Sequence, residues 1–348
     1  MIRRIRLAIV MVRPAVLALL ATFTTLGLAR AGHAEDPVAL LRAGVVVAGF
    51  LMFAAAVNDL ADVEIDRVNL AGDRRRPLVT GAAGRLEFVV TAALSAALAL
   101  GVAATINLAA LAVTAAGLLL GAGYSLRPVR LAQRGAVASL VLPACYVAVP
   151  YLLGILVVRD SVRSGDLLLL AGLYVGFVGR ILLKDFRDVR GDALFGKRTF
   201  LVRHGRRATC RFSAVGWVAG TAAIVAAAAP SIALVATDAV LLAVALVLLR
   251  ALSVDAGPHR DEALVAALAI IARGIVVTLL AHLATTGWSP VASAAVTAAL
   301  GVLTLGQARV MARFGPPARR LSPADERQMS GWPVGSMRGA AAAAPDRP

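Results

Sequence analysis

Residues 58–69 read NDLADVEIDRVN and directly follow an uncharged run of apolar residues, 43–57. Asp59, Asp62 and Asp66 fall at positions i, i+3 and i+7, so on a helix their carboxylates share one face. Like charges gathered on one helical face repel each other. The stretch therefore predicts an apolar helix whose acidic end either faces water or binds something positively charged.

The composition indicates a membrane protein. Residues of the types AVILMFWYC make up 59% of the 348 positions, and a further 31 are glycine. In soluble domains, apolar residues counted with glycine reach only about 45–50%. Several runs carry almost no charge over the roughly 20 residues that a helix needs to cross a bilayer. We expect an all-α, polytopic bundle of nine or ten transmembrane helices, at 7–29, 38–57, 86–105, 107–124, 135–158, 166–183, 211–229, 232–250, 262–286 and 290–312.

The distribution of positive charge predicts an orientation. The net charge of +16 does not indicate nucleic acid as a partner, because the basic residues fall between apolar runs and form no patch interleaved with aromatics. Of the 36 lysines and arginines, 30 lie in or beside the gaps on the side that carries the N-terminus. The positive-inside rule then places the N-terminus and the acidic stretch in the cytoplasm, in a multi-pass protein of the cell membrane.

The two ends of the chain differ from the apolar middle. The start resembles a secretory signal, but the run 7–29 is long for one and contains Arg13-Pro14, so we expect a retained first helix. Residues 315–348 are rich in proline, arginine and alanine and show no apolar periodicity, which predicts a disordered cytoplasmic tail. Residues 1–314 would then form a single membrane-embedded domain.

A second acidic stretch repeats the spacing of the first. Residues 184–192 read KDFRDVRGD, and Asp185, Asp188 and Asp192 again fall at i, i+3 and i+7. Each lies 126 residues after its counterpart in the first stretch. Both stretches end an apolar run on the same predicted side. The repeat predicts two related halves, each contributing one acidic helix end.

The residue types favour magnesium and a diphosphate. Carboxylates inside a membrane bundle are costly and usually mark a functional site. Oxygen ligands with no histidine or cysteine nearby favour Mg²⁺ over zinc or copper. Mg²⁺ is commonly held by carboxylates together with substrate phosphates, and the basic residues that follow both stretches suit phosphate oxygens. Solvated helix ends are the alternative interpretation, which two equivalent copies disfavour.

The motifs resemble those of the UbiA-type intramembrane prenyltransferases. The first family motif, NDxxDxxxD, is matched at 58–66, and the RPLxxG that follows it is matched at 76–81. The second, KDxxDxxGD followed by GxRT, is matched at 184–192 and 196–199. Arg13-Pro14 and Tyr124-Ser125 also fit the family pattern. One position departs from it: Arg130 stands where relatives of the chlorophyll-synthase kind carry a lysine, and the two side chains bind phosphate differently.

The resemblance implies a helical bundle in two halves around a lipid-accessible central cavity that both motifs cap. It implies Mg²⁺-dependent transfer of a prenyl group from an allylic prenyl diphosphate to an aromatic or other small acceptor in the membrane. The implied Mg²⁺ ligands are Asn58, Asp59, Asp62, Asp185 and Asp188, with Asp66 and Asp192 as further catalytic acids. The implied substrate contacts are Asn58, Arg67, Arg76, Tyr124, Arg130, Lys184 and Arg198.

Other functions are compatible with the same residues. The fold would also suit a terpene cyclase, or a phosphoribosyltransferase acting on a polyprenyl phosphate. A cation transporter is a remote alternative, because its acids should lie near the bilayer midplane and the flanking cations would repel its substrate. The acceptor, the prenyl chain length and the oligomeric state stay open.

Two arginines fall inside predicted spans. Arg180 lies one helical turn before Lys184, so it either reaches the diphosphate or extends to the interface. Arg273 lies deep in the ninth predicted span, where charge is costly. We expect Arg273 to pair with an acid or to line the cavity.

Overall fold

The computed structural model describes residues 11, 13–69, 76–186 and 199–316, and its regular elements in these ranges are all helices. Nine spans in the described part of the chain are long and apolar enough to cross a membrane, and α2 is a shorter apolar helix beside them. The all-α membrane bundle is therefore confirmed, and α6 and α7 belong to one of its spans. The helices are α2 (Pro14–Arg30), α3 (Pro37–Asn69), α4 (Arg85–Ala104), α5 (Leu108–Ser125), α6 (Ala136–Pro143), α7 (Val149–Leu156), α8 (Ser164–Ile181), α10 (Phe200–Ala227), α11 (Ile232–Leu252), α12 (Pro258–Ala284) and α13 (Pro290–Phe314).

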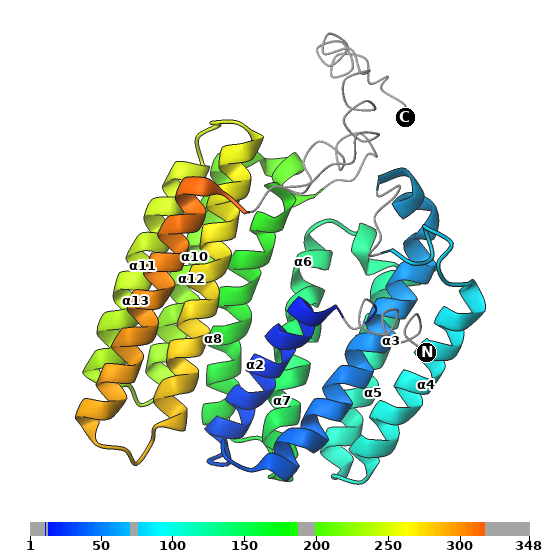
Figure 1. The fold of residues 1–348 in the computed structure, drawn as a ribbon, viewed down its shortest axis with the longest axis horizontal. Coiled ribbons are helices and arrows are strands. Elements are labelled where there is room, and N and C mark those ends of the chain that lie inside the picture. Colours follow the sequence, from blue (N-terminus) through cyan, green and yellow to red (C-terminus); the bar gives the residue numbers. More distant parts are fainter. Residues whose placement is uncertain (1–10, 12, 70–75, 187–198, 317–348) are drawn as a thin grey trace.

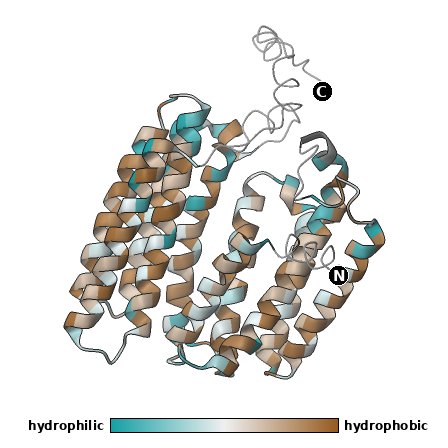
Figure 2. Cartoon of the chain, in the orientation of Figure 1, coloured by the Kyte–Doolittle hydropathy of each residue, from teal (hydrophilic) through white to brown (hydrophobic). Residues whose placement is uncertain are grey.

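The helices run side by side along one direction (Figure 1). Their flanks are largely hydrophobic, whereas hydrophilic residues gather toward the helix ends (Figure 2). We call the end that carries residues 58–69 and 184–186 the motif end. The predicted tail lies, from residue 317 onward, outside the described residues.

The first helix begins later than predicted. We expected a span from residue 7, but α2 starts at Pro14, behind a left-handed Arg13 with φ 50° and ψ 71°. Proline suits the first position of a helix because its missing N–H would have no partner there. In Figure 1, α2 accordingly begins partway along the bundle. This late start places Arg13 beside Asp59 of α3.

The halves predicted from the repeat are visible in the helix boundaries. Shifted by 126 residues, α5 covers 234–251, and α11 spans Ile232–Leu252. The same shift brings α3 onto α8 and α4 onto α10. The large buried side chains form two main clusters, and α2 contributes Leu20 to one and Phe23 to the other. The helix α2 thus packs between the two halves.

The fifth predicted span contains an irregular turn. Residues Val137–Leu156 cross the bundle as one apolar segment, but the stretch Ala144–Ala148 is a π-helix between α6 and α7. Pro143 and Pro150 each lack a backbone N–H, so the regular ladder of hydrogen bonds is interrupted here. The ring of Tyr146 in this turn stacks on Phe177 of α8, with ring centroids 6.0 Å apart.

Glycines set the closest helix contacts. A side chain on Gly220 of α10 would bring its Cβ to 2.6 Å from the backbone nitrogen of Gly176 on α8. A side chain on Gly154 of α7 would likewise overlap the Thr24 carbonyl of α2. Small residues at such crossings let helix backbones approach in a membrane, where packing replaces the hydrophobic effect.

An ion pair at the motif end joins α10 to α12. Arg206 donates to both carboxylate oxygens of Asp261, at 2.6 and 2.7 Å. Its guanidinium carbon also lies 5.0 Å from the centre of the Phe186 ring. Because Phe186 directly follows Asp185, this contact links α12 to the second acidic stretch.

Candidate active site

The first acidic face meets an arginine from the start of α2. The Asp59 side chain, in a residue only 7% exposed, accepts a hydrogen bond from Nη2 of Arg13 at 2.5 Å. Arg76, from the segment between α3 and α4, donates to the same carboxylate oxygen of Asp59. Arg76 Nη1 also lies 3.3 Å from Oδ2 of Asp66. Arg76 thus bridges the first and third aspartates of the face.

The middle aspartate has a cation of its own. Arg130 Nη2, from the segment after α5, donates to Oδ1 of Asp62 at 2.8 Å. Asn58 Nδ2 donates to the other oxygen of the same carboxylate, also at 2.8 Å. Asn58 therefore fixes the orientation of Asp62 from within the same helix. The arginine that departs from the family pattern contacts the first acidic motif.

Three arginines from separate segments thus converge on the acidic face of α3. Arg13 and Arg130 both have positive φ, 50° and 35°, which is uncommon for residues other than glycine. Such strained backbone often accompanies functional sites. The sequence left open whether water or positive charge meets these acids. In the structure, arginine side chains of the same chain contact them. From the sequence we assigned Arg13 no role in the site, although Arg13-Pro14 lies in the first predicted span and fits the family pattern.

The pKa of Asp66 reflects both the acids and the arginines around it. This residue lies beyond the membrane-spanning part of α3. Burial raises the pKa of its carboxyl, and the Arg76 guanidinium acts in the opposite direction. The neighbouring carboxylates of Asp62 and Asp59 raise this pKa further. The arginines therefore do not fully offset the combined effect of burial and of the neighbouring acids on the pKa of Asp66.

The second motif is described only in part. Asp185 follows Lys184 at the end of a short 3-10 turn (Leu182–Lys184) and is 4% exposed. Asp188, Asp192 and Arg198 lie outside the described residues, as does the side chain of Arg67. Tyr124 is half-buried near the end of α5.

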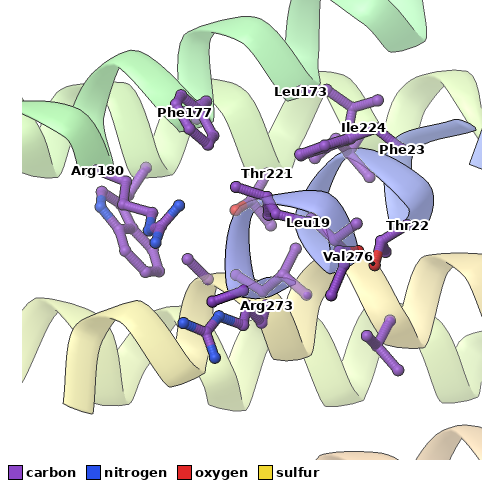
Figure 3. A pocket seen from close by; sticks show the side chains of 17 residues that line it. Leu19, Thr22, Phe23, Leu173, Phe177, Arg180, Thr221, Ile224, Arg273 and Val276 are labelled. Atoms are coloured by element: carbon purple, nitrogen blue, oxygen red, sulfur yellow. Dashed lines mark hydrogen bonds between the residues drawn. The ribbon is translucent and has the colours of Figure 1, made fainter. Parts of the chain in front are cut away.

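A cavity of about 220 Å³ lies between α2, α8, α10 and α12. Its walls include both arginines of the predicted spans, Arg180 and Arg273, together with Phe177 (Figure 3). The expectation that Arg273 lines the cavity is confirmed.

These features define a polytopic helical membrane protein with a mixed acidic and basic site at one end of its bundle. The chain belongs to the UbiA prenyltransferase family, whose model matches residues 18–270.

Chlorophyll and bacteriochlorophyll synthases are among the proteins similar to this chain. The 33 kDa chain of bacteriochlorophyll synthase from Cereibacter sphaeroides is 30% identical over 172 residues, which are 49% of this chain and 55% of that one. The 34 kDa chain from Chloroflexus aurantiacus is 25% identical over 175 residues, again 49% and 55%. The chloroplast chlorophyll synthase of Oryza sativa is 28% identical over 193 residues, 53% and 48%. The matches span about half the length of these relatives.

Solved structures show the same fold. A digeranylgeranylglyceryl phosphate synthase superposes with a TM-score of 0.67 at 17% identity, over 82% of this chain and 100% of that one. A UbiA homologue from Archaeoglobus fulgidus bound to DMAPP and Mg²⁺ gives a TM-score of 0.53 at 14% identity, over 88% and 99%.

Proposed function

We propose that this chain transfers a prenyl group from an allylic prenyl diphosphate to a small acceptor in the membrane and releases diphosphate. The observation that carries the proposal is the convergence of Arg13, Arg76 and Arg130 on one acidic helical face at the end of an apolar bundle. An anionic head group suits the arginines, whereas the prenyl tail suits the apolar interior.

The side chains at this site are of the chemical types that bind magnesium. The acidic residues offer carboxylate oxygens and Asn58 an amide oxygen, all of which Mg²⁺ accepts as ligands. Among the described residues no three acidic, histidine or cysteine side chains already converge on one point. The arginines instead hold the carboxylates of Asp59 and Asp62. We infer that binding exchanges partners, so that the guanidinium groups move from carboxylate to phosphate oxygens.

In the proposed reaction the bond between C1 of the prenyl chain and the diphosphate oxygen breaks, and its electron pair leaves with diphosphate. Bound Mg²⁺, held by Asn58, Asp59, Asp62, Asp185 and Asp188, would neutralise charge on the leaving group. Hydrogen bonds to its oxygens would come from Arg76 and Arg130, together with Lys184, Arg67 and Arg198. We add Arg13 to this set.

The acceptor completes the reaction at C1. Its nucleophilic atom forms the new bond to the allylic carbon and loses its proton. We place the ring of Tyr124 beside the developing cation, because the face of an aromatic ring favours positive charge. The apolar helices around it exclude water, which would otherwise capture the cation. We further propose that the motif end faces the cytoplasm, as the positive-inside rule predicts.

The test is a measurement of diphosphate release by the purified protein in detergent. Geranylgeranyl diphosphate would be supplied with Mg²⁺ or with EDTA, beside a panel of hydroxybenzoate, homogentisate, dihydroxynaphthoate, a porphyrin acid and a glycerol phosphate ether. Mass spectrometry would read the products. We expect Mg²⁺-dependent release and an acceptor whose mass has risen by one prenyl group.

Other results would point to the alternatives. Release of diphosphate without a modified acceptor would indicate a terpene cyclase. Turnover of phosphoribosyl diphosphate with a polyprenyl phosphate would indicate the phosphoribosyltransferase. No release from any donor by a folded protein would contradict the proposal and favour a transporter.

A further inference from the structure

We propose that the groove between α10 and α11 at the motif end binds the head group of an anionic phospholipid from the surrounding bilayer. Its walls carry Arg207, Arg211 and Arg250, which would contact the lipid phosphate, above an apolar part that would contact the acyl chains. Its described walls include no residue of the acidic motifs. The site is therefore additional to the proposed prenyl transfer and does not depend on it.

The groove opens on the outside of the bundle. On the inner side of α10, the Ser213 hydroxyl donates to the Gly179 carbonyl of α8 at 2.8 Å. A side chain on Gly216 would bring its Cβ to 2.9 Å from Cα of the same glycine. Arg211 and Ala214 each stand two positions before one of these α10 residues, about 200° around the helix. The groove face of α10 therefore points away from α8, toward α11 and the lipid.

The three arginines lie at the depth of lipid head groups. The backbone of α10 breaks at Gly205, with φ 75° and ψ 173°, so its regular part runs over residues 206–227. At about 1.5 Å per residue this part is roughly 33 Å long, close to the hydrocarbon thickness of a bilayer. Arg207 lies in its first turn, Arg211 lies one turn further, and Arg250 is in the last turn of α11. Long basic side chains near helix ends extend to the interface, so all three reach the head-group layer.

The positive charge of the groove is not balanced within the described part of the chain. The adjacent Arg206 is a contrast, because it donates to both carboxylate oxygens of Asp261. No described residue forms a hydrogen bond or an ion pair with the side chain of Arg207, Arg211 or Arg250, and the described lining contains no acid. Guanidinium groups gathered on one groove repel each other, and each offers donors that suit phosphate oxygens. A phosphate between them would compensate this charge.

The remainder of the groove is mostly apolar. Cys210 and Leu249 are 4% and 2% exposed, and Ala214 and Leu246 line the walls beside them. Val218, which is 45% exposed, continues the same face of α10 one turn beyond Ala214. The groove has a volume of about 520 Å³. Basic pockets between transmembrane helices bind anionic lipid head groups, whereas a free phosphate would leave the apolar part unused.

A second groove, between α11, α12 and α13, has a similar composition but less available charge. Arg260, Arg309 and Arg313 lie on its walls. Arg260 donates to the Ala312 carbonyl at 2.7 Å, and the guanidinium carbon of Arg313 lies 5.3 Å from the centre of the Phe314 ring. Because two of these arginines already have internal partners, we assign the lipid to the groove between α10 and α11.

The experiment measures lipid binding by the whole purified protein and needs no turnover. Native mass spectrometry from detergent would give the fraction of protein that binds dioleoyl phosphatidylglycerol. Dioleoyl phosphatidylcholine is the zwitterionic comparison, and dioleoylglycerol lacks the phosphate. We expect phosphatidylglycerol to bind about tenfold or more tightly than either comparison lipid, and we expect inorganic phosphate in large excess not to displace it.

Four variants make the assignment specific. A double variant, Arg207→Gln with Arg211→Gln, should remove most of the preference for phosphatidylglycerol, because each basic residue at a membrane surface contributes about fivefold. Arg250→Gln should reduce the preference about fivefold by itself. Ala214→Trp keeps every charge but fills the groove, so it should also weaken binding. Arg309→Gln removes an exposed arginine from the second groove and is the matched control, whose preference should stay within twofold of wild type.

Equal affinity of the wild-type protein for phosphatidylglycerol and phosphatidylcholine would overturn the inference. An undiminished preference in the double variant would overturn it, as would an equal loss in Arg309→Gln, because general charge would then explain binding. Displacement by inorganic phosphate would assign the groove to a free anion and exclude the lipid. Gel filtration in phosphatidylcholine checks the folding of each variant, and if the double variant does not fold, Arg250→Gln and Ala214→Trp decide. These readouts are independent of diphosphate release, so the lipid site and prenyl transfer can fail separately.

Discussion

Replacing Asp59 with asparagine removes the carboxylate that two arginines share while keeping its shape. Asp59 accepts from Arg13 at 2.5 Å and from Arg76, whose side chains are 30% and 24% exposed. A charge-assisted hydrogen bond contributes about 1.5–3 kcal/mol when buried, and partial exposure of both arginines reduces this. We therefore expect the substitution to cost about 2 kcal/mol of folding free energy, which lowers the melting midpoint by a few degrees.

The effect on catalysis should be much larger than the effect on stability. Without its charge, residue 59 is a poor Mg²⁺ ligand, and leaving-group stabilisation of this kind is worth about 10²- to 10³-fold in rate. Donor binding should change little, because the freed arginines still reach phosphate oxygens. The assay is the initial rate of diphosphate release at saturating Mg²⁺, with binding of the thiodiphosphate measured in parallel.

Glu64→Gln is the matched control for Asp59→Asn. It removes one negative charge from the same helix at an exposed position. We expect its rate to stay within twofold of wild type. A rate within threefold of wild type in Asp59→Asn would refute the reasoning, as would an equal loss in both variants, because general charge would then explain the result.

Three further substitutions test separate parts of the structure. Arg130→Lys keeps the charge but loses the planar fork, so we expect the KM for prenyl diphosphate to rise about tenfold, read from initial rates; an unchanged KM would count against its role. Gly220→Leu should prevent folding, since its Cβ would lie 2.6 Å from Gly176, whereas Gly306→Leu, with open space around it, should elute normally in gel filtration. Arg206→Ala leaves a buried acid unpaired and should cost about 3 kcal/mol, and an unshifted thermal melt would contradict this.

The sequence predicts the helices and the acidic face because both are local patterns. Apolar runs of bilayer length fix the spans, and the spacing of Asp59, Asp62 and Asp66 is enough to place them on one helical face. The repeat at 126 residues anticipates the correspondence of α5 with α11, since duplicated sequence keeps its spacing. The late start of α2 was missed, because the apolar run continues on both sides of Arg13-Pro14.

The partners of the acids are tertiary features that local spacing cannot give. Arg13, Arg76 and Arg130 come from three segments, and nothing in their own neighbourhoods tells which aspartate each contacts. The cavity is similar in this respect. Which face of an apolar helix lines it depends on helix rotation, which glycine contacts between helices set. The residues that share the cavity wall with Arg273 therefore could not be predicted from the sequence.

A structure with geranylgeranyl thiodiphosphate and Mn²⁺ in place of Mg²⁺ would test the proposed exchange of partners most directly. The anomalous signal of manganese would locate the metal, and the phosphate oxygens would show which arginines they contact. We predict metal density between Asp59, Asp62 and Asp185, with Arg76 and Arg130 turned from the carboxylates to the diphosphate. Diphosphate bound elsewhere, with the pairs of Arg13 and Arg76 to Asp59 intact, would contradict the proposed site.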